Sequence, residues 1–566
     1  MRNNTEDAAE DAEETDEGFE GITLVDAKNG FNELSRYAML WTARHKWAKV
    51  SRFAMNCYRH FSRVVMRQPG SEPVFLSEEG VTQGDPFAGI LYGIGLLPLA
   101  ECLRAADPST LQPFYADDLM LFSKALKSVK LLKILVAKGP YVGYYPEPDK
   151  SWHVCPKGEE ESAKRIFADA GMNVKCCQGQ RYLGGFVGSD ATKEKWLYPM
   201  VDRWVHGVGA LADVAGQYSQ TAYAGMAQCL QVEWQYLSRC VLGVEKYLEP
   251  VEKAIHERFI PALFRVDKLD DDFRCLLANG AKQAGIGSRN PVESEVALHE
   301  SSLEATKVLV ENLLDNGVLY HTAHKYAVRK AGKEAREGRI ENEKIGVIQL
   351  GRRKGRRIKK QLDRQLHTGA WLSAHPNRFD GTELCRDEFY DNLTLRYGNR
   401  SKGLPSHCDG CSNGFTVEHG LRCKKGVLVG QRNNDVRDEL AHLCTLSLNE
   451  SQVKTEPEIV YRSDSRASQP REDCHCTGKG RNGKTICKCL GDEARGDVAA
   501  HGFWKSGRTT IFDVRVTGTD AMSYGNTASE KILESAAKQK RSKYEEACTK
   551  RRRDFNPIFY SVDGMP

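Results

Sequence analysis

Three short motifs near the start of the chain carry acidic side chains whose types and spacing could do chemistry. They read VDAKNGFN at residues 25–32, GVTQGDP at residues 80–86 and FYADD at residues 114–118. Carboxylate oxygens are the ligands that Mg²⁺ prefers, and two such cations about 4 Å apart can clamp the attacking and leaving oxygens of a displacement at phosphorus. Taken singly, each Asp also fits a turn or a helix cap, and the Gly/Pro segment fits an ordinary loop. All three motifs in this order and at these separations are much harder to obtain by chance than any one of them.

The motif set resembles the palm of reverse transcriptases, in particular those of non-long-terminal-repeat retrotransposons. The resemblance implies that Asp26, at the end of a strand, and Asp117, the first acid of the paired motif, hold two Mg²⁺ with Asp118 beside them. Carboxylates that close together repel one another without a cation, which suits a site that traps one. The fold expected for this part is a right-hand polymerase palm.

Further positions take roles only through the same resemblance. Phe31 matches the aromatic residue that crowds the sugar 2′-hydroxyl and so selects deoxynucleotides. Gln83 and Gly84 match the loop under the incoming nucleotide and template base. Lys150 matches the downstream lysine of the palm, although a surface lysine is nearly as good an interpretation, and the YLGG segment at residues 182–185 resembles the hairpin that grips the primer.

The family has a fingers subdomain before its first motif, and here only an acidic segment of about 20 residues precedes that motif. These residues hold too little apolar surface to fold, so we expect them to be disordered. The fingers are therefore expected to be largely missing, and the polymerase site is expected to be present even if its activity is weak or absent.

A cysteine-rich segment holds a second kind of site. Cys408, Cys411, His419 and Cys423 have the spacing C-x2-C-x7-H-x3-C. Three thiolates and one imidazole satisfy tetrahedral Zn²⁺ at bond lengths of about 2.0–2.3 Å, and four protein ligands leave no open position for a substrate. A reduced cysteine-rich loop is the alternative. The spacing favours a structural zinc knuckle.

Two further cysteine pairs, Cys474 with Cys476 and Cys487 with Cys489, flank a polar segment that is compatible with a hairpin. They could hold a second Zn²⁺, and a plain cysteine-rich insertion fits them equally well. The chain has 18 cysteines and no visible export signal, which favours metal binding over a disulfide framework.

Downstream of the cysteines, Asp497, Asp513 and Arg515 form a pattern of acid, gap, then acid-x-base. Asp513 and Arg515 stand two apart on an alternating strand, so both face the same side. Two carboxylates are what a Mg²⁺-dependent phosphodiesterase needs to hold its metal. The alternative interpretation is a solvated strand with alternating charge.

The order of palm, helical region, zinc knuckle and acidic pattern resembles retrotransposons that carry a restriction-like endonuclease of the PD-(D/E)XK fold. The resemblance implies that Asp497 and Asp513 hold the nuclease metal, while Arg515, in place of the usual Lys, gives fixed electrostatic support. Residues 432–438 resemble the helix that opens this nuclease. Lys540 and Tyr544 match a helical Lys and Tyr downstream, and an ordinary helix face explains them equally well.

Composition places these motifs in a chain of several domains. The 566 residues are 40% hydrophobic and 28% charged, with a net charge of +5 and a mean hydropathy of −0.52. This is enough apolar material for several cores, and it excludes wholesale disorder and a collagen-like fibre. The longest nearly uninterrupted apolar run, residues 89–100, is shorter than the roughly 20 residues of a membrane span.

A basic run bears on partners and location. Residues 351–360 hold seven Lys or Arg. Such a run attracts phosphate backbones through counterion release, or serves as a nuclear localisation signal, and a solvated basic helix face is the alternative. With no signal peptide visible, we expect an intracellular, nuclear protein.

The expected fold class is multidomain α+β, with strands at residues 22–26 and 114–117 and helices at residues 33–65 and 86–103. The expected segments are a disordered acidic N-terminus (1–20), a reverse-transcriptase palm (21–195), a helical thumb or connection (196–315), a basic linker (316–365), a zinc-knuckle region (366–425) and an α/β restriction-like endonuclease domain (426–566).

The function expected from these resemblances is an RNA-directed DNA polymerase with an appended DNA endonuclease, which acts in target-primed reverse transcription. Its partners would be an RNA template, a DNA target or primer and deoxynucleoside triphosphates, with no membrane. Mg²⁺ would serve both acidic sites, and Zn²⁺ the knuckle. The alternative is a decayed or domesticated copy that binds nucleic acid without catalysis, and a third reading is a nuclease with an inert palm. The sequence leaves the DNA target, the RNA template and the oligomeric state open.

Overall fold

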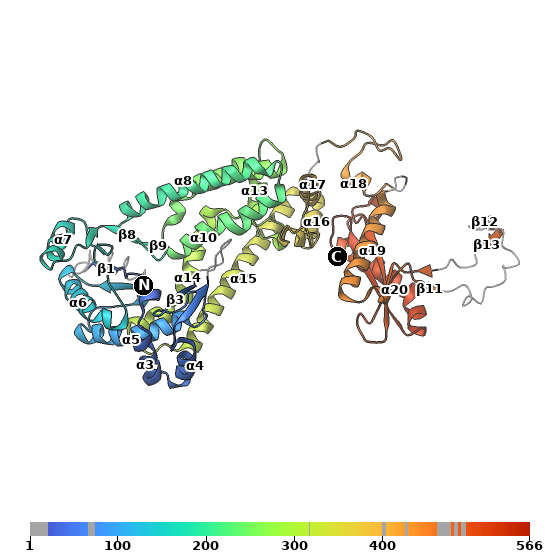
Figure 1. Cartoon of the computed structure of the whole chain (residues 1–566). Coiled ribbons are helices and arrows are strands. Elements are labelled where there is room, and N and C mark those ends of the chain that lie inside the picture. Colours follow the sequence, from blue (N-terminus) through green and yellow to red (C-terminus); the bar gives the residue numbers. More distant parts are fainter. Residues whose placement is uncertain are drawn as a thin grey trace. The chain divides into compact units, whose positions relative to one another are not determined.

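The computed structural model describes residues 21–65, 74–315, 317–398, 403–423, 425, 428–460, 477–479, 485–487 and 494–566. It is a mixed α/β chain of several domains, 58% helical, with several small sheets (Figure 1). Two compact units are present: unit 1 comprises residues up to 206 with 232–251 and 291–336, and unit 2 comprises 207–231, 252–290 and 337–566. The expected disordered segment 1–20 lies outside the described residues, as do Cys474, Cys476 and Cys489.

Unit 1 is built around a five-stranded sheet of order β4-β5-β1-β6-β7. Its strands are β1 (Ile22–Val25), β4 (Phe114–Tyr115), β5 (Asp118–Phe122), β6 (Trp152–Val154) and β7 (Lys175–Cys177). Strand β1 is antiparallel to both of its neighbours, and only the β6–β7 pair is parallel. The two strands predicted from sequence, at 22–26 and 114–117, are confirmed as β1 and β4.

Alternating side chains bury both faces of this sheet, as the period of two residues requires. Leu119 and Leu121 of β5 join the core beneath the helices, whereas Leu24 and Met120 join a second cluster with Val187 of a covering hairpin. The other elements are α2 (Gly30–Glu33), α3 (Arg36–Lys46), α4 (Ala48–Tyr58), β2 (Ser62–Val65), β3 (Val74–Ser77), α5 (Ala88–Ala106), α6 (Ala125–Lys138), η2 (Gly139–Val142), α7 (Glu160–Asp169), β8 (Gly179–Tyr182) and β9 (Gly185–Gly188).

The single helix expected over residues 33–65 is two helices and a strand. The backbone leaves helical geometry at Trp47 (φ −143°, ψ 63°), whose N–H still donates to the Ala43 carbonyl and so ends α3. Neither Gly nor Pro marks this break in the sequence. The β-branched pair Val64 and Val65 then favours the extended strand β2.

Among the described helices, α5 alone is long and apolar enough by composition to cross a membrane. Its side chains Leu91, Leu96 and Leu99 are buried in the unit 1 core. Packing inside unit 1 therefore accounts for the apolar length of α5, and the helix predicted at 86–103 is confirmed.

Residues 190–365 are almost entirely helical, including the stretch expected as a basic linker. Pro250 and Pro261, expected as breaks, occupy the second residues of α11 and α12. The helices are α8 (Asp190–Ala215), α9 (Ser219–Ala224), η3 (Gly225–Leu230), α10 (Gln231–Cys240), η4 (Val244–Tyr247), α11 (Glu249–Ala254), η5 (Ile255–Phe259), α12 (Ile260–Phe264), α13 (Asp271–Ala278), η6 (Ala281–Gln283), α14 (Pro291–Leu314), α15 (His321–Lys354) and α16 (Arg356–Gln365).

The C-terminal part of unit 2 is a four-stranded mixed sheet between two helices. Helix α19 (Leu428–Ser447) packs on one face through Cys444 against Phe512, and α20 (Ser529–Lys550) packs on the other through Tyr544 against Ile511. The sheet order is β10-β15-β16-β17, with β16–β17 parallel and the other pairs antiparallel. The remaining elements of unit 2 are η7 (Ala370–Ser373), α17 (Arg386–Tyr397), α18 (Val417–Gly420), η8 (Glu450–Gln452), β10 (Val453–Thr455), β11 (Glu458–Val460), β12 (Thr477–Lys479), β13 (Thr485–Cys487), β14 (Ala494–Arg495), β15 (Val498–His501), β16 (Thr509–Thr517), η10 (Met522–Tyr524) and β17 (Arg553–Ser561).

Charged side chains tie α16 to this sheet inside unit 2. The buried Arg364 guanidinium lies 2.7 Å from Asp520 and 2.5 Å from Asp563. Lys360 donates to the Thr519 carbonyl at 2.7 Å, and Arg422 lies 3.5 Å from Asp520. We call these side chains the Arg364 cluster. The last turns of the expected linker are thus an integral part of the unit 2 fold.

Candidate functional site

The strand register of unit 1 brings its three candidate acids to one edge of the sheet. Val25 of β1 lies opposite Leu119 of β5, so Asp26, which directly follows β1, comes next to Asp118, the first residue of β5. Asp117 sits in the tight turn between β4 and β5, next to Ala116, which has a positive φ of 53°. Residues far apart in the chain are therefore neighbours here because of the antiparallel pairing.

The electrostatics of this edge are those of crowded like charges. Burial raises the pKa of Asp118 to about 6, with Asp117 and Asp26 adding repulsion. Burial also raises the pKa of Asp26, while the nearby Lys150 lowers it in part. Lys150 itself is exposed and pairs with Glu147 at 2.7 Å. In the part of the chain that the structure describes, no ion pair within 4.0 Å joins these three acids to a Lys or Arg, which favours binding of a cation from solution.

Aromatic side chains form the wall behind Asp117. The Tyr144 hydroxyl donates to the Asp117 carbonyl at 3.1 Å, and Phe31 stacks on Tyr92 with ring centroids 4.7 Å apart. A Cβ at Gly30 would lie 2.5 Å from the Asp117 Cβ and 2.7 Å from the Tyr92 hydroxyl. Sequence reasoning missed Gly30, Tyr92 and Tyr144, because their closeness to Asp117 arises only from the fold.

The loop with Gln83 and Gly84 is placed by the segment that follows Asp26. The N–H of Val81 donates to the Phe31 carbonyl at 2.8 Å, and the N–H of Gly80 donates to the Leu34 carbonyl at 2.8 Å. Gln83 and Gly84 are exposed, and Gly84 has a φ of 95° that favours glycine. The structure thus brings this loop against the Phe31 segment but shows no bond from Gln83 to the acids in the part it describes.

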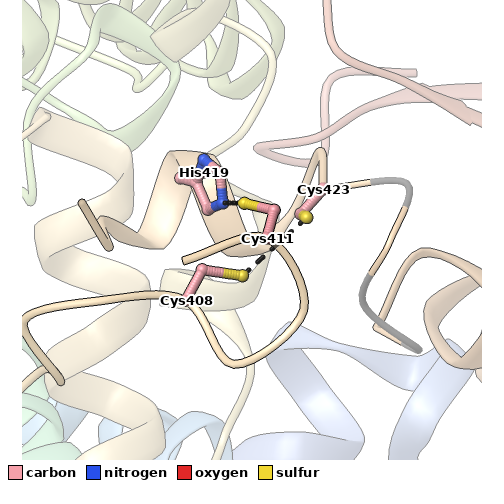
Figure 2. Close-up of side chains that lie close together, drawn as sticks. All are labelled: Cys408, Cys411, His419 and Cys423. Atoms are coloured by element: carbon pink, nitrogen blue, oxygen red, sulfur yellow. Dashed lines mark hydrogen bonds between the residues drawn. The ribbon is translucent and has the colours of Figure 1, made fainter. Parts of the chain in front are cut away.

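The zinc ligands predicted from sequence converge in space. The Sγ atoms of Cys408, Cys411 and Cys423 and a ring nitrogen of His419 all lie within 4.8 Å of one another (Figure 2). The Cys408 and Cys423 sulfurs are 3.8 Å apart, and the Cys411 sulfur is 3.2 Å from His419 Nε2. Tetrahedral Zn²⁺ with bonds of about 2.3 Å places its sulfurs about 3.8 Å apart, so this donor set fits the ion.

Local backbone geometry presents these ligands. The N–H of Ser412 donates to the Cys408 carbonyl at 2.7 Å, and Ser412 has a φ of 60°, so the chain turns back sharply between the first two cysteines. Thr416 caps α18 by accepting from the His419 N–H at 3.0 Å. The N–H groups of Cys411 and Gly410 donate to the Cys408 sulfur and lower its pKa, which favours the thiolate that a metal binds. Four protein ligands make this a closed, structural type of centre.

The hairpin expected between the other cysteine pairs is present in part. Strand β12 pairs with β13 so that Thr477 lies opposite Cys487. The other cysteines of that candidate lie outside the described residues.

The acids of the C-terminal sheet also lie together, on adjacent strands. The carboxylate of Asp497, just before β15, accepts from the Val514 N–H of β16 at 2.5 Å. Burial raises the pKa of Asp497, with the neighbouring Asp513 adding to the rise. Asp513, only 5% exposed, lies 2.6 Å from Lys540 of α20.

Arg515 follows Asp513 by two residues on β16 and faces the same side. In the described part of the chain, however, the cation on Asp513 is Lys540, and no ion pair joins Arg515 to either acid. Lys540 was matched to a lysine of the family in the sequence analysis but was assigned no role there. Because α20 packs on β16, Lys540 supplies the cation beside Asp513, a role that the sequence analysis expected of Arg515.

The ligand atoms of Asp26, Asp117 and Asp118 are less tightly gathered than those of the knuckle. Among the described residues, the knuckle is the one group of three or more His, Cys, Asp or Glu whose ligand atoms lie mutually within 4.8 Å. The carboxylates of Asp26, Asp117 and Asp118 would have to turn toward a cation to hold it. No protein-family model matches the sequence, and a search of curated proteins finds no match.

Proposed function

We propose that the chain is an RNA-directed DNA polymerase of retrotransposon origin with an appended DNA endonuclease. One observation carries the polymerase part: antiparallel pairing of β1 with β5 sets Asp26 beside Asp118 and Asp117 at one sheet edge. Burial raises the pKa of Asp118 to about 6, repulsion from Asp117 and Asp26 adds to the rise, and this crowding favours binding of a cation at the edge.

Within this proposal, Asp26 and Asp117 hold Mg²⁺, and Asp118 stands beside them. Bound Mg²⁺ would stabilise the charge on the attacking and leaving oxygens of nucleotide addition. The Phe31 ring, which stacks on Tyr92, would crowd the 2′-hydroxyl of a sugar bound beside the acids. The exposed Gln83–Gly84 loop lies against the Phe31 segment, a position from which it can meet the base of an incoming nucleotide.

Primer extension tests the polymerase proposal. The chain is given an RNA template, a DNA primer, Mg²⁺ and deoxynucleoside triphosphates. We expect extension by the unaltered chain, retention in Asp169→Asn, which changes an exposed acid at the end of α7, and a loss of at least about 1,000-fold in Asp117→Asn because a metal ligand is removed. Equal extension by Asp117→Asn would refute the site. No extension by any folded variant would favour the non-catalytic alternative, a nucleic-acid-binding zinc protein.

A second activity is favoured by the pairing of Asp513 with Lys540 next to Asp497. Two acids and a lysine on a mixed sheet between α19 and α20 support a restriction-like nuclease, in which Asp497 and Asp513 hold Mg²⁺ and Lys540 stabilises the developing charge. Nicking of supercoiled plasmid tests it: Lys540→Gln should lose at least about 100-fold in rate, and Arg515→Gln should lose much less. The opposite ranking would return the role to Arg515.

A further inference from the structure

The first two long helices of unit 1 carry an unusual charge pattern. Residues 34–65 contain seven Lys or Arg and no Asp or Glu. Arg36 is buried and bonds to backbone carbonyls, and Lys46 pairs with Glu101 at 2.7 Å, so these two are occupied inside the protein. No ion pair within 4.0 Å joins Arg44, Lys49 or Arg52 to an acid in the part of the chain that the structure describes.

The free cations share faces with exposed aromatic rings. On α3, Tyr37, Trp41 and Arg44 are spaced i, i+4, i+7 and so lie on one face, with Tyr37 80% and Trp41 54% exposed. On α4, Phe53 is 45% exposed and shares a face with Lys49 and Arg52. We call these six side chains the α3–α4 face.

The opposite sides of the same helices are buried. Met39 of α3 and Ala54 and Tyr58 of α4 belong to the unit 1 core. Because these sides of α3 and α4 are packed against the core, the aromatic and basic side chains on the other sides remain exposed to solvent. Exposed large apolar side chains of this kind mark interaction surfaces.

We propose that the α3–α4 face binds single-stranded nucleic acid. Unpaired Arg and Lys attract the phosphate backbone, and aromatic rings stack on bases of any sequence. Charge complementarity selects this occupant, because the surface has cations but no acids, and alternating rings and cations suit a strand whose bases are unpaired. The inference deepens the proposed function by naming a strand-binding surface, and it does not rest on metal binding at the acidic edge.

The test is equilibrium binding of a fluorescein-labelled 20-nucleotide deoxythymidine strand to the full chain. It is carried out without Mg²⁺ or nucleotides and in the Asp117→Asn background, so that it reports on the surface whether or not polymerisation occurs. The triple variant Arg44→Gln, Lys49→Gln, Arg52→Gln should weaken binding at least tenfold at about 0.1 M salt. It should also reduce the slope of log affinity against log salt by about 2, since each phosphate contact on a single strand contributes about 0.7.

A second variant separates stacking from charge. Trp41→Ala should weaken binding by roughly five- to 100-fold with an unchanged salt slope, because stacking contributes without releasing counterions. The matched control is Lys124→Gln, Lys133→Gln, Lys138→Gln, which removes three exposed cations on or next to α6. It should change affinity less than twofold, and circular dichroism should show all variants equally folded.

Several outcomes would overturn the proposal: affinities within twofold of the unaltered chain for both test variants, an equal loss in the α6 control, or tighter binding of a duplex than of the single strand. A change in sedimentation mass with Trp41→Ala, without a change in strand binding, would instead assign the face to contacts between copies of the chain.

Discussion

The acidic edge of unit 1 and the acidic pair of the C-terminal sheet solve the same electrostatic problem in different ways. Asp26, Asp117 and Asp118 crowd together near the exposed Lys150, and burial, with repulsion adding to it, raises the pKa of Asp118. Asp513 is buried, but Lys540 neutralises it at 2.6 Å, and Asp497 accepts a backbone N–H. Among the described residues, the first set has no ion-pair partner, whereas the second has Lys540.

This difference bears on how a metal would enter each site. In unit 1 a cation would relieve existing repulsion, so its binding would stabilise the fold. In the C-terminal sheet a cation would compete with Lys540 for Asp513, so its binding would have to displace an existing ion pair. A lysine released from that pair would be free to face a phosphate.

The largest effect should come from breaking the satisfied pair. Asp513→Asn leaves the Lys540 ammonium, about one quarter exposed, without its partner, and we expect a loss of about 3 kcal/mol in the free energy of unfolding. Urea unfolding measures it. The double variant Asp513→Asn, Lys540→Met should recover part of the loss, because it removes the unpaired charge as well. No loss in the single variant would mean that the pair contributes nothing.

An intermediate effect should come from crowding the open site. Gly30→Ala places a methyl group 2.5 Å from the Asp117 Cβ, so Asp117 or Tyr92 must move, and we expect a loss of about 2 kcal/mol together with reduced primer extension. Gly89→Ala in α5 is the matched control, because nothing lies within 4 Å of its Cβ. Equal behaviour of the two variants would show that the contact around Asp117 is loose.

The smallest effect should come from relieving repulsion at the open site. The pKa of Asp118 is about 6 in the folded chain and ordinarily 3.8. Its ionisation therefore lowers the free energy of unfolding as pH rises from about 4 to 6. Asp118→Asn should therefore stabilise the metal-free chain by about 1 kcal/mol at pH 7.5, after allowance for solvent screening, and by almost nothing at pH 4.

Thermal melting of both proteins across this pH range measures the difference. Burial lowers the pKa of His153, in the same unit, to about 4, so its contribution is lost as pH falls from about 6.5 toward 4. That term is common to both proteins and cancels at each pH. A difference that shrinks as pH rises would contradict the repulsion argument.

The features set by local sequence patterns could be predicted, whereas the features set by long-range packing mostly could not. The strands around Asp26 and Asp117 and the helix at 86–103 follow from alternation and helical spacing, and the four knuckle ligands follow from their spacing alone. These features depend on residues that are close in the chain, so the sequence pattern alone is enough to predict them.

Features that depend on packing were not predictable in this way. The pairing of Lys540 with Asp513 requires α20 to lie on the sheet, and the contact of Gly30 with Asp117 requires the β1–β5 register. The break at Trp47 has no Gly or Pro to announce it. The basic stretch that includes 351–360 fitted either a linker or a basic helix, and its charge alone did not show that α16 is anchored to unit 2 through Arg364.

The Arg364 cluster also sets an order of assembly as the chain emerges from the ribosome. The Cys408–Cys423 pair of the knuckle spans 15 positions, whereas Arg364 and Asp563 are 199 positions apart. Closing the longer loop costs about 2 kcal/mol more in chain entropy, and Asp563 is synthesised later than Cys423. The knuckle can therefore close before the acidic partners of α16 have been synthesised. The parallel strand β17, followed by Asp563, completes the C-terminal part of unit 2 last.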